Sequence, residues 1–169
     1  MKVTNALNHL ADTEDINERV RRIAAKLDSM AVPMDVRIFS VDEYRKVFPQ
    51  GKVDTPIGEV KIGQNQFSKL AEKDHGKRQE LIGAMRQTLA DPIAILQEEK
   101  EGRRAYIFLK SFTKGDKTSI IVSVVVTIEN KKVVISTHKR KKREILNKIK
   151  MADVMTYEKG HGASPTNGL

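Results

Sequence analysis

Residues 103–150 hold three runs typical of β-strands and then a basic block: RRAYIFLKSF (103–112), TSIIVSVVVTIEN (118–130), KKVVISTH (131–138) and KRKKREILNKIK (139–150). Alternating apolar positions rich in Val and Ile indicate strands that are buried on at least one side. The strongest strand signal of the chain and most of its positive charge therefore lie in one stretch.

The charge is unevenly distributed. Residues 100–150 contain fifteen Lys or Arg and four Asp or Glu, a net charge of +11, whereas the whole chain of 169 residues carries +9. The remainder of the chain thus carries −2. Basicity confined to one region favours a polyanionic partner such as nucleic acid.

The composition excludes several classes of site. The chain has no cysteine, which excludes disulfides, thiolate zinc sites and a cysteine nucleophile. No apolar run approaches the ~20 residues of a membrane span, and the first ten residues lack the apolar region of a signal peptide. We expect a cytoplasmic protein, or a fragment delivered by a larger carrier, with no membrane partner and no cofactor. The carboxylates of Glu98, Glu99 and Glu101 read as solvated charges, so no metal site is predicted.

The segments before the strands predict a mixture of short elements. Apolar residues spaced by three and four predict a helix over residues 13–30, followed by a strand over 34–39 and a short helix over 40–48. Glycine and proline mark residues 50–63 as a loop, which carries a short extended piece. Two further helices are predicted over 65–73 and 77–90, and a strand starts at 93. The predicted domains are an N-terminal α/β unit (1–50), the main domain (51–159) and a disordered tail (160–169).

These elements predict an α+β fold: N-terminal helices packed on one face of a four-stranded antiparallel sheet, a C-terminal basic helix and a small N-terminal α/β appendage. Period-two alternation then gives the sheet an aliphatic core face and an open polar face. The side chains expected on the open face are Arg104, Tyr106, Lys110, Ser123, Ser136 and His138. A two-residue turn at Asn130-Lys131 would place Ser123 opposite His138.

Such a face has the groups needed to cleave RNA without a metal. The reaction needs proton transfer at the 2′-OH and at the 5′-oxygen, and neutralisation of the charge on the phosphate; His138 suits the first task and Lys110 and Arg104 the second. Tyr106 would stack on a base or donate a proton. The alternative reading of His138 is an exposed histidine at a strand end. The basic block reads either as a solvated helix face or as a phosphate-binding surface, with nuclear localisation as a weak rival. His75 reads as a loop histidine.

The order helix, helix, four-stranded sheet, with LIGAMRQTLADPIAI (81–95), RAYIFLKSF and SIIVSVVVTIENKKVVISTHKR, resembles the phage-associated branch of the barnase, EndoU, tRNase-colicin and RelE nuclease superfamily. Its domains occur in MuF-type and polyvalent proteins of phages and mobile elements. The resemblance covers about residues 55–150. It implies a metal-independent ribonuclease with its site on the open sheet face; the glutamate that barnase-like members use as base has no evident match.

The residues and the resemblance together predict a metal-independent endoribonuclease that cleaves RNA by attack of the 2′-OH on the adjacent phosphate, acting as a phage or mobile-element toxin or effector. Its expected nucleic-acid partner is single-stranded RNA or tRNA, and its expected protein partner is an immunity protein or a larger phage polyprotein. The alternatives are a non-catalytic nucleic-acid-binding module and an interaction domain of a polyvalent phage protein. The candidate catalytic residues are His138, Lys110, Arg104, Tyr106, Thr137 and Ser136, and the candidate nucleic-acid-binding residues are Arg103, Ser123, Lys139, Arg140 and Arg143.

Overall fold

The computed structural model describes residues 15–37, 43, 45, 46, 48–63 and 80–160. Within them, the helices are α2 (Ile16–Ser29), α5 (Leu81–Ala90), α6 (Lys142–Met151) and the 3-10 turn η1 (Pro49–Gly51). The strands are β1 (Val32–Pro33), β2 (Lys52–Thr55), β3 (Gly58–Lys61), β4 (Ala94–Lys100), β5 (Arg103–Lys114), β6 (Lys117–Ile128), β7 (Lys131–Arg140) and β8 (Val154–Glu158).

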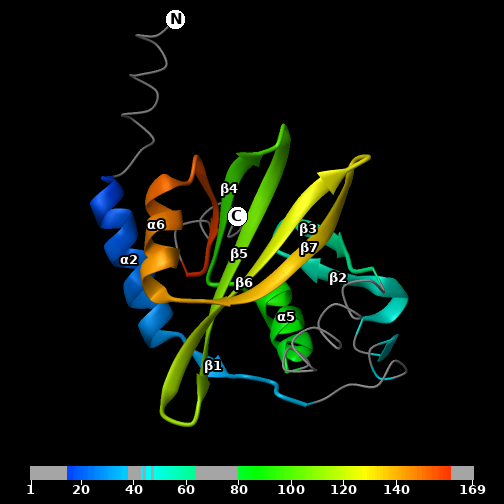
Figure 1. Cartoon of the computed structure of the whole chain (residues 1–169), viewed down its shortest axis with the longest axis horizontal. Helices are drawn as coiled ribbons and strands as arrows, with labels where there is room; N and C mark the ends of the chain where they lie inside the picture. The colour runs from blue at the N-terminus through cyan, green and yellow to red at the C-terminus, as the bar shows by residue number, and fades with distance from the viewer. Residues whose placement is uncertain (1–14, 38–42, 44, 47, 64–79, 161–169) are drawn as a thin grey trace, which may run out of the picture.

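The strands form one curled, mixed sheet in the order β2-β3-β7-β6-β5-β4-β8, with β1 alongside β5 (Figure 1). The pairs β3–β7 and β1–β5 are parallel, and the other neighbours are antiparallel. The 12-residue strands β5 and β6 make a long hairpin at the centre of the sheet. They are the runs that the sequence predicts most clearly.

The predicted fold class is wrong, because the sheet has eight strands rather than four and helices pack on both of its faces. The predicted loop over residues 50–63 contains the hairpin β2–β3, and the basic helix is followed by β8, which pairs with β4. Four-residue strands are too short to show a clear alternation, so the sequence indicated one short extended piece in this segment but not a paired hairpin.

The other predicted elements have mixed outcomes. The helices α2, α5 and α6 are confirmed. The predicted strand over 34–39 is wrong where it is described, because β1 ends at Pro33 and residues 34–37 are not in a strand. The predicted helix over 65–73, most of the one over 40–48 and nearly all of the predicted tail lie outside the described residues.

The sheet separates two apolar cores. One core lies between the sheet and α5 and contains Phe108 and Phe112 of β5. The other lies between the sheet and the neighbouring helices α2 and α6, and contains Ile107 and Leu109. The aliphatic face was therefore predicted correctly as a core, but the opposite face of β5 is also covered, because its two phenylalanines give α5 an apolar surface to pack on.

Helix α2 is fixed to the sheet by charge as well as by apolar contacts. The carboxylate of Glu158 in β8, which is 7% exposed, accepts hydrogen bonds from Arg22 and Lys26, each at 2.6 Å. Burial alone would raise the pKa of Glu158, but these two cations hold it below its usual value. The predicted domain boundary at residue 50 stays a prediction. Helix α2, which precedes residue 50, shares the second core with strands that follow residue 50.

Candidate nucleic-acid interface

Strand β7 contains a β-bulge that determines which of its side chains share a face. Val134 lies opposite Val125 of β6, and Ser136 lies opposite the adjacent Val124, so Ile135 is an extra residue in β7. Such bulges redirect the side chains that follow them. The bulge brings side chains from both halves of β7 onto one face of the sheet. These are Lys131, Val133, Ser136, His138 and Arg140.

This face of β7 is partly open to solvent. Ser136 and His138 are half-buried, and Lys131 and Arg140 at the two ends of the strand are exposed. On β5, in contrast, the same face of the sheet is buried beneath α2 and α6. An accessible polar face therefore exists, but it is the face opposite to the one that carries Tyr106 and Lys110.

The predicted register between β6 and β7 is wrong for two reasons. The turn consists of Glu129 and Asn130, with φ values of 51° and 66°, and not of Asn130 and Lys131. Two left-handed residues are typical of a type I′ hairpin turn. The turn and the bulge together place Ser123 opposite Thr137 and place His138 opposite Val122.

The predicted site residues therefore fall into two groups on opposite faces of the sheet. The side of the sheet that faces α5 carries Arg104, Tyr106, Lys110, Ser123, Thr137 and Lys139. The other side carries Arg103, Ser136, His138 and Arg140, and Arg143 is exposed in the first turn of α6. The expectation that Arg104, Lys110 and His138 share one face is wrong.

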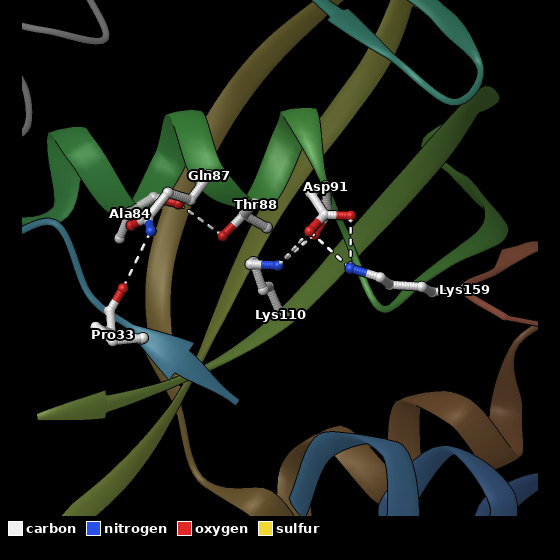
Figure 2. A network of polar contacts seen from close by, with 7 residues as sticks. All are labelled: Pro33, Ala84, Gln87, Thr88, Asp91, Lys110 and Lys159. Atoms are coloured by element: carbon white, nitrogen blue, oxygen red, sulfur yellow. Dashed lines mark hydrogen bonds and ion pairs between the residues drawn. The ribbon is translucent and has the colours of Figure 1, made fainter. Parts of the chain in front are cut away.

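Lys110 is held at the end of α5. It is 2% exposed, and its Nζ donates to the backbone oxygen of Asp91 at 2.5 Å and lies 3.2 Å from Asp91 Oδ2 (Figure 2). Burial lowers the pKa of Lys110, and Asp91 acts in the opposite direction. Burial would raise the pKa of Asp91, but Lys159, at 2.7 Å, and Lys110 bring it below its usual value. These contacts connect β5, α5 and the end of β8.

Other polar candidates on the α5 side also have partners within the fold. Ser123 and Thr137 are 0% and 2% exposed, and their hydroxyl oxygens lie 3.0 Å apart. A hydroxyl pair of this kind satisfies the hydrogen bonding of two buried polar groups. Tyr106 is half-buried and packs against the first core, whereas Arg104 is exposed at the start of β5.

A pocket of about 570 Å³ lies where β7 passes into α6. Its lining contains four consecutive cationic residues, two hydroxyl groups and two carboxylates among a few apolar side chains. The lining residues are Leu27, Asp28, Thr118, Ser119, Ile120, Lys139, Arg140, Lys141, Lys142 and Glu144. Cations and hydroxyls are the side chains that most often contact nucleic-acid phosphates.

Two features of this pocket could not be seen in the sequence. The carboxylate of Asp28 lies at the end of α2 and contacts Lys142 Nζ with both oxygens at 2.8 Å, across 114 positions of the chain. Thr118 and Ser119 begin a strand and carry no motif. The basic block did indicate Lys139 and Arg140, which the pocket brings together with these hydroxyls.

Carboxylate or imidazole clusters are sparse in the described part of the chain. Among these residues, no group of three or more His, Asp or Glu side chains is placed to hold a metal ion. None of the helices over the same residues has the length and apolar character needed to cross a bilayer.

The comparisons with known proteins agree with the resemblance seen in the sequence. A sequence model of the family described as phage-Barnase-EndoU-ColicinE5/D-RelE like nuclease2 matches residues 39–158. This span includes all strands from β2 to β8, together with α5 and α6, and leaves out α2. Neither the curated proteins nor the solved structures compared with the chain gave a match. The chain thus belongs to this family of phage-associated nucleases.

Proposed function

We propose that the chain is a metal-independent endoribonuclease that cleaves RNA by attack of the 2′-OH on the adjacent phosphate. The observation that carries this proposal is the alignment of Ser136, His138 and Arg140 on the accessible face of β7, next to the basic pocket at the start of α6. Family membership supplies the nuclease activity, and this site supplies residues for the chemistry.

His138, Arg140 and Ser136 have different proposed roles in cleavage, which follow from the chemistry of their side chains. His138 carries out one of the two proton transfers, because an imidazole exchanges a proton near neutral pH. Arg140 neutralises the charge that grows on the phosphate in the transition state, and its planar guanidinium can contact two oxygens at once. Ser136 orients the same phosphate by a hydrogen bond.

The pocket beyond Arg140 binds the next part of the RNA backbone. Lys139 and Lys141 are exposed there, and Thr118 and Ser119 add hydroxyl donors. Phosphate contacts of this kind position a nucleic acid without reading its sequence. Lys110, Ser123 and Thr137, on the other side of the sheet, are proposed to maintain the fold and not to contact the scissile phosphate.

The biological role proposed for this activity is that of a phage or mobile-element effector, with RNA as its target and an immunity protein or a larger phage polyprotein as its protein partner. This part of the proposal is supported by the family description alone. The basic pocket would also suit a module that binds nucleic acid without cleaving it, which is the second candidate function.

A chimeric oligonucleotide separates the two functions. A DNA strand with a single ribonucleotide is incubated with the full chain in EDTA. The proposal expects one cut, directly 3′ of the ribose, and a 2′,3′-cyclic phosphate on the product. Salt-dependent binding without a cut would favour the non-catalytic module, and a cut at deoxynucleotides would exclude a 2′-OH mechanism.

A further inference from the structure

Three lysines come together where β2, β3 and β7 lie side by side. Lys52 lies directly opposite Lys61 in the β2–β3 hairpin. Lys61 pairs with Val133 of β7, two residues beyond Lys131. Paired residues and alternate residues share a face of a sheet, so the three lysines lie on the same face as His138. We call Lys52, Lys61 and Lys131 the lysine trio.

The three lysines outnumber the carboxylates near them, because only Glu59 and Asp54 of β2 and β3 lie on the same face. The pKa of Lys61 is held below its usual value, first by the positive charge of the neighbouring Lys131, and then by burial and Lys52. Glu59 acts in the opposite direction on Lys61, and its Oε1 lies 3.6 Å from Lys52 Nζ. Like charges opposite one another destabilise a sheet, and a bound anion would relieve this repulsion.

The position of the trio relative to His138 indicates which anion it would bind. Lys131 and His138 are seven residues apart on the same strand, roughly 23 Å at about 3.3 Å per residue. The face between them is half-buried and polar at Ser136. Proteins that bind single strands commonly use a positively charged track that follows the phosphate backbone.

We infer that the lysine trio binds a backbone phosphate of the RNA several nucleotides away from the cleaved bond. The inference rests on the proposed function, which gives the path of the RNA. The RNA strand would lie along β7, from the pocket beside α6 to the β2–β3 hairpin. It makes the enzyme specific for substrates long enough to reach both ends of β7.

Binding of a non-cleavable strand tests the trio without relying on catalysis. Affinity for a long 2′-O-methyl RNA oligonucleotide is measured against salt concentration for the wild type, Lys61→Gln, Lys131→Gln and the control Lys150→Gln. Lys150 is exposed in the last turn of α6, away from the trio. Loss of one phosphate contact should lower the slope of log affinity against log salt by about 0.7. We expect this change in both trio variants and not in the control.

Glu59→Gln provides a second test with the opposite sign. It removes the negative charge beside Lys52 and Lys61, so the variant should bind the long strand more tightly than the wild type. If Lys61→Gln and Lys131→Gln keep the wild-type slope, or if Glu59→Gln does not tighten binding, the inference is overturned. A wild type that binds with the expected slopes but cuts no RNA would refute the proposed function and leave the trio standing.

Discussion

Replacing Glu158 by glutamine tests how α2 is held on the nuclease domain. The carboxylate is buried and accepts hydrogen bonds at 2.6 Å from both Arg22 and Lys26. The substitution leaves two cations, 22% and 15% exposed, without their counter-charge. Breaking a buried ion pair on one side costs about 3 kcal/mol when the remaining charge stays partly buried.

For a chain of this length, that loss corresponds to a decrease in Tm of roughly 6–12 °C. Calorimetry at neutral pH measures the Tm of the wild type and of Glu158→Gln. Glu99→Gln, which removes an exposed carboxylate from neighbouring β4, is the matched control. A decrease below about 2 °C for Glu158→Gln would show that these contacts do not hold α2 in solution.

The same variant has a defined pH dependence. The pKa of Glu158 is lower in the folded chain than its usual value of 4.5, so its stabilising contribution is fully present above that value. The contribution disappears as the pH falls through the folded-state pKa. The difference in stability between wild type and Glu158→Gln should therefore be largest at neutral pH and shrink in acid; a difference that grows in acid would contradict the sign.

Three other substitutions test other contacts. Lys110→Met should lose about 1–3 kcal/mol, because the carbonyl of Asp91 loses its donor, and should still cleave RNA; loss of cleavage in a folded variant would place Lys110 in the site. Gly83→Ala should lower Tm despite the ~1 kcal/mol helix preference for alanine, because its Cβ would lie 2.5 Å from the backbone oxygen of Asp35. An unchanged or higher Tm would contradict that contact. Asp28→Asn should tighten nucleic-acid binding in an anisotropy assay by releasing Lys142, and weaker binding would argue against the pocket as a phosphate site.

The helices and strands that were predicted correctly each have a clear apolar periodicity in their own sequence. Helix α2 has apolar residues at helical spacing, and β5 and β6 alternate over 12 residues each. The elements that were missed depend on distant pairing. Strand β3 is short and joins the sheet through a parallel pairing with β7, at Lys61 and Val133.

The candidate site was only partly predictable for a similar reason. The sequence indicated His138 and the basic block with Arg140, and the structure places Arg140 on the same face as His138 and in the lining of the pocket. The sequence did not reveal the bulge at Ile135, because isoleucine and the valines around it suit a regular strand. It also did not show that Phe108 and Phe112 would draw α5 onto the face that carries Lys110. One extra residue in β7 and one helix decide which polar groups lie together.

The proposed role of His138 can be tested directly by measuring RNA cleavage in EDTA by the wild type, His138→Ala and the control His9→Ala, which removes a histidine outside the matched family region. We expect wild-type and control chains to cleave RNA to 2′,3′-cyclic phosphates. His138→Ala should lose cleavage while keeping the wild-type circular dichroism spectrum and the wild-type affinity for RNA. Undiminished cleavage by His138→Ala would contradict the proposed site.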